Sequence, residues 1–233
     1  TDDQIPEFKK IKNISLKKKL KLFTLKNKYF QILSHNYKNE AQILKIEHGN
    51  LIHEVRVNLV GKIQLKNIMM AVIAASKSNL DLKKIFSVIP RLSSVEGRFE
   101  KIGKIKNKSL VFLDYAHTPD ALQACILNIR EQFPDKHISL LFGCGGDRDR
   151  GKRSKMGKIA DKYADKVYLT DDNPRHERPK KIRDEIKRGI KKRQIIEISN
   201  RKEAIVKAIN NLNTGNVLIV AGKGHEKIQQ IGN

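Results

Sequence analysis

Four segments of the chain combine charged and polar side chains with glycine or proline, and each follows a short apolar run. The segments are 114–120, 143–153, 170–175 and 221–226. Arg148 and Arg175 carry planar guanidinium groups that bind carboxylates through paired hydrogen bonds, whereas an ionised Glu226 accepts hydrogen bonds from an ammonium group. These residue types predict a pocket for an amino acid. Two arginines favour a ligand with an additional carboxylate over one with an aliphatic amine tail.

The elements that must position these segments alternate between two hydrophobic periods. Short apolar runs predict buried strands at 110–113, 138–142, 167–169, 195–198 and 217–220. Helical stretches separate them at about 120–132, 153–164, 179–192 and 201–212. This alternation is typical of an α/β fold whose mostly parallel sheet has helices on both faces. Because ligands bind beyond the carboxyl ends of such strands, we expect the four polar segments to form one site.

Each polar segment also has an ordinary explanation when it is taken alone. Asp-Asn-Pro is a common turn, Gly-Gly-Asp is a common loop, and His117 precedes a helix for which Thr118 suits the N-cap and Pro119 the first position. Cys144 is interpreted as a small loop residue, since nothing in the sequence indicates an activated thiol. The hypothesis of a site therefore depends on four such segments meeting at one edge.

The first part of the chain has a different organisation. Residues 16–60 alternate apolar and polar stretches, as at 21–25, 41–46 and 51–57, and predict a small set of paired strands. A helix is expected over 64–78 and a shorter one over 81–88, ending before Pro90. We place the boundary between Pro90 and Gly97, which gives two domains, 1–94 and 95–233.

Composition limits the classes of protein that fit. The 233 residues are 39% apolar and no apolar run approaches the length that crosses a bilayer, so we expect neither a membrane span nor a secretory signal. Two cysteines without metal-ligand spacing fit a reducing compartment, which predicts a cytoplasmic protein. The chain begins with Thr1 and ends just after an apolar run, and we expect a fragment cut at both ends.

The charge and the motifs bear on two further classes of function. A net charge of +23 is typical of nucleic-acid binders, so a basic nucleic-acid-binding module is the alternative hypothesis. The lysines are spread from Lys9 to Lys227, however, and the aromatic residues fall mostly in apolar runs, so we expect no nucleic-acid partner. A dinucleotide-dependent oxidoreductase would need G-x-G-x-x-G after the first strand of the α/β region, where Asp114-Tyr115-Ala116-His117 stands instead.

The motifs themselves resemble those of a known family. Asp-Tyr-Ala-His-Thr-Pro-Asp-Ala-Leu at 114–122, Phe-Gly-Cys-Gly-Gly-Asp-Arg-Asp at 142–149, Thr-Asp-Asp-Asn-Pro-Arg at 170–175 and Gly-Lys-Gly-His-Glu at 222–226 occur in the order and spacing of the Mur ligases. They are most similar to the members that add meso-diaminopimelate to UDP-N-acetylmuramoyl-L-alanyl-D-glutamate. The resemblance runs across essentially the whole chain and is strongest from Gly97 onward.

The resemblance implies an activity, two domains and a set of substrate contacts. Residues 1–94 would be the C-terminal part of the central ATP-binding domain, and 95–233 a Rossmann-like domain that binds the amino acid. Such ligases use ATP and Mg²⁺ to phosphorylate the D-glutamyl carboxylate, and the amine of diaminopimelate then attacks the acyl phosphate, a step in peptidoglycan synthesis and hence in cell-wall biogenesis, cell shape and division. The implied contacts to meso-diaminopimelate are Arg148, Asp172, Asn173, Pro174, Arg175, Gly222 and Glu226. Arg175 would distinguish this amino acid from lysine, which lacks its second carboxylate.

The resemblance also implies nucleotide contacts. Asn67 matches an adenine-side Asn, and Arg98, Asp114, His117 and Asp147 match positions near the nucleotide, with Asp114 and His117 as the catalytic pair. Gln64 stands where the family has a second Asn, and Ser154 replaces a usual Pro. No residue of the chain is assigned as a metal ligand, and the P-loop and the carbamylated lysine that helps to bind Mg²⁺ are expected upstream. We therefore expect this chain alone to have no ligase activity. We also expect the protein to be a monomer.

Overall fold

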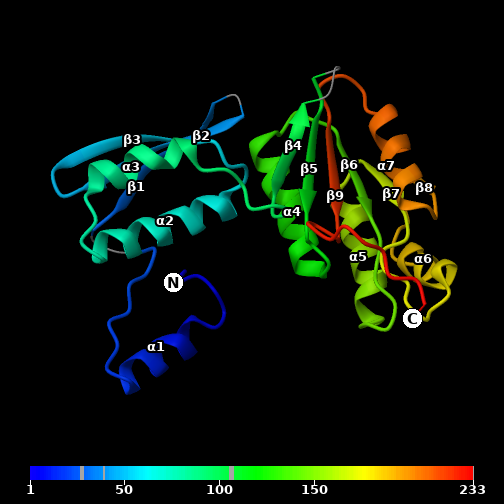
Figure 1. Ribbon diagram of the computed structural model, residues 1–233, viewed down its shortest axis with the longest axis horizontal. Helices are drawn as coiled ribbons and strands as arrows, with labels where there is room; N and C mark the ends of the chain where they lie inside the picture. Colours follow the sequence, from blue (N-terminus) through cyan, green and yellow to red (C-terminus); the bar gives the residue numbers. More distant parts are fainter. Residues whose placement is uncertain (27–28, 39, 105–107, 233) are drawn as a thin grey trace. The chain divides into compact units, whose positions relative to one another are not determined.

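The structure, a computed structural model, describes residues 1–26, 29–38, 40–104 and 108–232 (Figure 1). The chain divides into two compact units, residues 1–93 and 94–233. Each unit has its own sheet and its own buried core.

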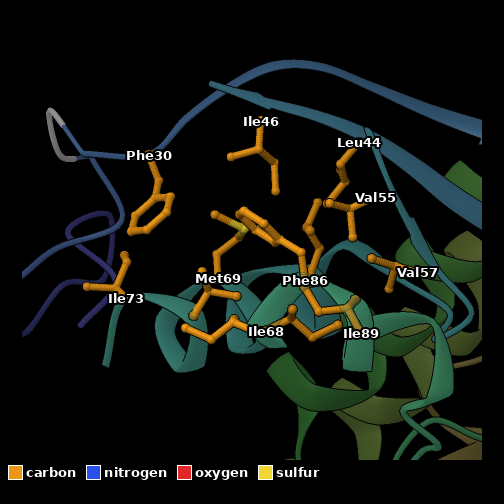
Figure 2. Close-up of a cluster of buried hydrophobic side chains, with 13 residues drawn as sticks. Phe30, Leu44, Ile46, Val55, Val57, Ile68, Met69, Ile73, Phe86 and Ile89 are labelled. Atoms are coloured by element: carbon orange, nitrogen blue, oxygen red, sulfur yellow. The ribbon is translucent and has the colours of Figure 1, made fainter. Parts of the chain in front are cut away.

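The first unit is an antiparallel sheet of three strands packed against helices. The strands β1 (Gln31–Lys38), β2 (Ala41–His48) and β3 (Leu51–Val57) lie in chain order. The helical elements are α1 (Phe8–Lys17), α2 (Lys62–Lys77), α3 (Leu82–Val88) and the 3₁₀ turn η1 (Ile89–Arg91). Alternate residues of β2 and β3 point to one face, and there they meet the apolar stripe of α2 (Figure 2). The labelled core side chains are Phe30, Leu44, Ile46, Val55, Val57, Ile68, Met69, Ile73, Phe86 and Ile89.

Part of the prediction for this unit was wrong. Residues 21–25 form no strand, although Phe23 and Leu25 pack against the core. The first strand is β1, which sequence patterning did not single out because much of it is exposed. Helix α2 begins two residues earlier than expected, at Lys62. Asp81 caps α3, with its Oδ1 accepting a hydrogen bond from the Lys84 N–H at 2.9 Å.

The second unit is a six-stranded sheet in the order β4-β5-β9-β6-β7-β8. Its strands are β4 (Glu100–Lys104), β5 (Leu110–Asp114), β6 (Ile138–Phe142), β7 (Lys166–Leu169), β8 (Ile195–Glu197) and β9 (Val217–Ala221). Only β4, which the sequence analysis did not predict, runs antiparallel, on the edge beside β5. The other five strands are parallel, as expected. Strand β9 lies between β5 and β6, which brings the last polar segment into the middle of the sheet edge.

Helices cover both faces of this sheet, as predicted (Figure 1). On one face, α7 (Arg201–Asn210) places Ala204 and Ala208 against side chains of the sheet such as Leu218. The helices α4 (Pro119–Gln132), α5 (Gly151–Tyr163) and α6 (Pro179–Lys187) pack side by side in chain order. Helix α6 is shorter than the expected 179–192. It ends before Gly189, where a Cβ would lie 2.0 Å from the Ser154 carbonyl oxygen of α5.

Candidate amino-acid and nucleotide site

The four polar segments lie at the carboxyl ends of β5, β6, β7 and β9, and two of them pack backbone against backbone. Gly146, in the loop after β6, lies so close to the loop after β7 that an added Cβ would be 1.9 Å from the Pro174 carbonyl oxygen. The Gly146 N–H also donates to the Asn173 carbonyl oxygen at 2.8 Å. A side chain at position 146 would therefore separate the two loops.

Asn173 and Glu226 form the centre of the site. Asn173 Nδ2 donates to Glu226 Oε2 at 2.9 Å, and Lys223 Nζ donates to the same carboxylate oxygen at 2.8 Å. Glu226 Oε1 receives the Tyr115 hydroxyl at a longer 3.3 Å. Burial raises the pKa of the Glu226 carboxyl, but the hydrogen bonds from Lys223 and Asn173 outweigh burial and hold that pKa below its ordinary value. Glu226 is thus an ionised acceptor suited to an ammonium group.

Two arginines lie beside Gly145, next to this centre. A Cβ at Gly145 would be 2.9 Å from Arg175 Nη1 and 3.8 Å from Arg148 Cγ. Arg175 Nη1 donates to the Gly146 carbonyl oxygen at 2.9 Å and, at 3.4 Å, to that of Asn173. Its Nε donates to Gln230 Oε1 at 3.1 Å, so the hydrogen bonds of Arg175 use Nε and Nη1 of the guanidinium group. Arg148 is exposed, and its Nη1 donates to the Asp147 carbonyl oxygen at 3.0 Å.

Asp172 and Gly222 close one side of the centre. The backbone of Gly222 has φ +109°, and an added Cβ there would lie 2.9 Å from Asp172 Oδ2, so only glycine fits. Below them, the buried Arg201 donates from Nη2 to the Ala221 carbonyl oxygen at 2.8 Å. Burial lowers the pKa of the Arg201 guanidinium, and the negative charges of Asp172 and Glu226 oppose that shift.

A buried ion-pair network holds the loop after β6 in shape. Arg153 is fully buried on α5 and donates to both carboxylate oxygens of Glu177, at 2.8 and 3.0 Å, and to Glu185 at 2.8 Å. Its Nη2 also donates to the Gly145 carbonyl oxygen at 3.1 Å. Glu177 Oε1 in turn accepts the Asp147 N–H at 2.7 Å. Hydrogen bonds from Arg153 lower the pKa of the Glu177 carboxyl to about 2.

The residues expected near the nucleotide phosphates lie on the loop after β5 and close to it. Asp114 accepts hydrogen bonds from the N–H groups of Phe99 at 2.7 Å and Ala116 at 2.8 Å, and burial raises the pKa of its carboxyl. The His117 Nδ1 lies 2.9 Å from the Tyr115 carbonyl oxygen, and the His117 side chain is exposed. The Arg98 guanidinium lies 4.4 Å from the centroid of the Tyr115 ring.

Asp147 makes a different set of contacts from Asp114. Its Oδ2 lies 2.7 Å from His176 Nδ1, and this hydrogen bond holds the pKa of the Asp147 carboxyl below its ordinary value. Asp147 has φ +52°, a left-handed conformation that Asp tolerates better than most residues. Asp147 thus lies on the loop that also carries Arg148. Among the contacts of the described residues, Asp147 makes none with Asp114.

The residue expected on the adenine side lies in the first unit. Asn67 and Gln64 both line a cavity of about 510 Å³ whose other lining residues are mostly apolar, among them Leu59, Ile68 and Val72. An apolar cavity with a few amides is typical of a site for a flat heteroaromatic ring. Both amides lie on α2, so the spacing of three residues puts them on one helix face.

Three other features concern metal ligands, cysteines and membrane spans. Among the described residues, no group of three or more His, Cys, Asp or Glu is arranged to hold a metal ion. Cys125 and Cys144 are buried free thiols, and burial raises the pKa of Cys144 to about 12, which fits its interpretation as a small loop residue without an activated thiol. Within the described part of the chain, no helix combines the length and the apolar character that crossing a bilayer requires.

Sequence reasoning missed several residues of the site. Lys223 and Tyr115 lie inside the motifs at 222–226 and 114–122, but the family resemblance implied no role for them. Their contacts to Glu226 could not be predicted from sequence spacing. Gln230 lies beyond the last motif, and its backbone N–H donates to Asn173 Oδ1 at 3.0 Å. Residues 230–232 run beside the loop after β7, where Arg175 N–H donates to the Gln230 carbonyl oxygen and Gly232 N–H to that of Arg175. No sequence signal marked this segment.

Comparison with known proteins places these features in a family. The family model described as "Mur ligase, glutamate ligase domain" matches residues 97–224. A UDP-N-acetylmuramoyl-L-alanyl-D-glutamate–2,6-diaminopimelate ligase of Rickettsia felis is 39% identical over 99% of this chain and 43% of its own length. The corresponding ligase of Rhizobium meliloti is 44% identical over 82% of this chain and 39% of its own length. The chain therefore spans less than half the length of these curated relatives.

Solved structures agree with the sequence comparison. A structure of a UDP-N-acetylmuramoyl-L-alanyl-D-glutamate–2,6-diaminopimelate ligase superposes with a TM-score of 0.69 and 32% identity, over 99% of this chain and 48% of that one. A folylpolyglutamate synthase of Mycobacterium tuberculosis has a TM-score of 0.71 at 16% identity, over 94% of this chain and 50% of that one, and shares the fold. With its motifs, its fold and these relatives agreeing, the chain belongs to the Mur ligase family.

Proposed function

We propose that this chain supplies the acceptor amino-acid site of an ATP-dependent ligase that joins meso-diaminopimelate to UDP-N-acetylmuramoyl-L-alanyl-D-glutamate in peptidoglycan synthesis. The named relatives that share this description support the proposal. They are ligases, which favours this function over nucleic-acid binding by a basic module. The observation that carries the proposal is the position of Asn173, which contacts Glu226 through its side chain and Arg175 through its carbonyl oxygen.

The amine end of the ligand is proposed to lie at Glu226. One oxygen of its ionised carboxylate, Oε2, accepts hydrogen bonds from Lys223 and Asn173. The other, Oε1, accepts the longer hydrogen bond from the Tyr115 hydroxyl. An ammonium group at Oε1 would gain a charge-assisted hydrogen bond, which is about twice as strong as a neutral one. Gly222 and Asp172 limit the space beside it.

The acidic end of the ligand is proposed to lie at Arg148 and Arg175. The Arg175 guanidinium and the Arg148 side chain both lie beside Gly145. The adjoining backbone is held by the Gly146 N–H, which donates to the Asn173 carbonyl oxygen at 2.8 Å. Lysine would leave one of these charges without a carboxylate, and an unpaired charge in a site costs affinity. The pair therefore favours meso-diaminopimelate over lysine, with Arg175 as the distinguishing residue.

The cavity on α2 fits the adenine base of ATP, whereas the described residues form no cluster that could hold a metal ion. In the first unit, the cavity with Asn67 and Gln64 supplies apolar walls and amide groups for a base. In the second unit, the residues proposed to lie near the nucleotide are Arg98, Asp114, His117 and Asp147. ATP would supply the phosphoryl group that activates a carboxylate as an acyl phosphate. We further propose that the protein acts in the cytoplasm as a monomer.

The proposal is tested by calorimetric titration of the 233-residue chain with meso-diaminopimelate and with L-lysine. We expect binding of meso-diaminopimelate at least about tenfold tighter than that of L-lysine, since one charged hydrogen-bonded pair contributes roughly 1.5–3 kcal/mol. Glu226→Gln should weaken both ligands, because both present an ammonium group. Equal or tighter binding of L-lysine by the unsubstituted chain would contradict the proposed specificity.

Activity needs a separate assay. Phosphate release from ATP is measured for the complete gene product that contains this chain, with both proposed substrates present. We expect release to depend on meso-diaminopimelate, and the 233-residue chain alone to show none. Release that is independent of the amino acid would show that the site has another role.

A further inference from the structure

Lys223 is a buried cation at the end of β9 for which neither the family resemblance nor the proposed substrate contacts provide a role. Its side chain is only 8% exposed. A buried lysine is unusual, because removing an ammonium group from water is costly unless the group is paired and hydrogen-bonded. Gly222 and Gly224, on either side of it, have φ +109° and +50°, values that glycine adopts readily, and the Lys223 side chain between them reaches Asn173 in the loop after β7. Such placement calls for a specific partner.

The first partner of Lys223 is the amide of Asn173. Lys223 Nζ donates to Asn173 Oδ1 at 2.7 Å, and the Gln230 N–H donates to the same oxygen at 3.0 Å. Because Oδ1 accepts two hydrogen bonds, the amide can have only one orientation, in which Nδ2 points toward Glu226. Lys223 therefore sets the orientation of the residue that joins the two ends of the proposed amino-acid site.

The second partner is the carboxylate of Glu226. Lys223 Nζ and Asn173 Nδ2 both donate to Oε2, at 2.8 and 2.9 Å. Oε1 has the longer contact of 3.3 Å with the Tyr115 hydroxyl. The carboxylate is thus held by one oxygen, and the other faces a weaker donor that a ligand ammonium can outcompete.

We propose that Lys223 is a positioning residue for amino-acid binding, which fixes Asn173 and Glu226 so that Glu226 Oε1 is presented to the ammonium group of the acceptor amino acid. The inference rests on the proposed function, since it assumes that Glu226 receives that ammonium group. Lys223 itself touches no ligand in this scheme, because its Nζ donates to Asn173 and Glu226 and its side chain is buried.

The charge of Lys223 should also influence the protonation of Glu226. The charged or titratable groups that face Glu226 are Lys223 from its own loop, Tyr115 from the loop after β5 and Arg201 from the start of α7. Burial raises the pKa of Glu226, and the hydrogen bond from Lys223 is the largest influence that lowers it. Without Lys223 the carboxyl would take up a proton at higher pH and lose its attraction for an ammonium group.

The test uses Lys223→Met, which removes the charge with little change of shape, in the 233-residue chain. We expect affinity for meso-diaminopimelate to fall about 10- to 100-fold near neutral pH. The pH below which binding is lost should move upward. Lys202→Met is the matched control: it removes one exposed lysine from α7, and both affinity and the pH dependence should be unchanged.

A double-substitution cycle separates positioning from a general structural effect. If Lys223 acts through Glu226, Lys223→Met should cost less than about threefold in affinity when Glu226→Gln is already present, because the two residues are coupled. Equal losses in both backgrounds would overturn the proposal, as would an unshifted pH dependence. Circular dichroism and thermal melting report whether each variant is folded.

The remaining outcomes separate the inference about Lys223 from the proposed function. Lys223→Gln, which keeps a donor for Asn173 without the charge, replaces Lys223→Met if the latter does not fold. A folded variant that binds as well as the unsubstituted chain would overturn the inference but leave the proposed function intact. If neither variant folds, Lys223 is a structural residue and the inference is wrong. If the unsubstituted chain binds no meso-diaminopimelate, the proposed function fails first.

Discussion

The guanidinium of Arg153 donates two hydrogen bonds to the carboxylate of Glu177, at 2.8 and 3.0 Å, and the Arg153 side chain has no exposed surface. This pair joins the start of α5 to the loop after β7, and Glu177 passes the link to the Asp147 N–H. The loop that carries Arg148 is therefore held in place by an ion pair beneath it. Buried pairs of this kind can fix a single arrangement of the groups around them.

Arg153→Met should lower the free energy of unfolding of the second unit by about 3–5 kcal/mol, because Glu177 and Glu185 would be left without their cation in a mostly buried place. Urea denaturation followed by circular dichroism measures the change. Lys180→Met, which breaks an exposed pair with Asp184, is the control and should have little effect. A loss for Arg153→Met no larger than that of the control would contradict a role in stability.

The same pair predicts how stability depends on pH. The folded pKa of Glu177 is about 2, below the value of about 4.3 in an unfolded chain, so the folded protein favours the ionised form. Its contribution is fully present above about pH 5 and is lost as the pH falls through about 4 to 2. The stability difference between the unsubstituted chain and Arg153→Met should shrink over this range. A difference that stays constant from pH 6 to pH 2 would show that Glu177 is not responsible.

Gly146→Ala should weaken both the fold and ligand binding, since the added Cβ would lie 1.9 Å from the Pro174 carbonyl oxygen and push two site loops apart. Overpacking of this kind costs about 1–3 kcal/mol. Thermal melting and meso-diaminopimelate titration check the two effects. Gly103→Ala in β4 is the control, because nothing lies within 4 Å of its added Cβ. Undiminished affinity in Gly146→Ala would mean that the loops do not need this contact.

The two arginines should affect specificity differently. Arg175→Ala is expected to reduce the preference for meso-diaminopimelate over L-lysine by about 10- to 100-fold, because it removes the charge that meets the additional carboxylate. Arg148→Ala should weaken both amino acids to a similar extent. Competitive titration of each variant with both ligands measures the ratio. The assignment of Arg175 would be wrong if its loss weakened both ligands alike.

Asn67→Ala should weaken binding of ATP about five- to tenfold, the expected effect of one hydrogen bond between neutral groups. Gln64→Asn, which shortens the other amide in the same cavity, should change affinity less. A fluorescent ATP analogue reports both constants. Asn50→Ala, at an exposed turn between β2 and β3, serves as the control. Loss of nucleotide affinity in the control but not in Asn67→Ala would place the base elsewhere.

Much of the second unit could be predicted from the sequence. Its parallel strands are continuous apolar runs because both faces are covered, and Thr118 caps α4 as expected, accepting the Ala121 N–H at 3.3 Å. The edge strand β4 escaped prediction because its sequence, Glu-Lys-Ile-Gly-Lys, has a weak alternation. In the first unit, the largely exposed β1 has no clear alternation, since few of its side chains are buried. Helix α1 was not predicted either, although Phe8, Ile11 and Ile14 recur at helical spacing.

The sequence by itself determined which chemical groups the site contains and that they follow strand ends, because strand periodicity and loop composition are local properties. It could not determine that β9 is inserted between β5 and β6, and this insertion places Lys223 and Glu226 against Asn173. Contacts between residues 50 or more positions apart depend on strand order and on loop conformation. Only the tertiary structure decided, for this reason, which oxygen of Glu226 is held and which one faces a weaker donor.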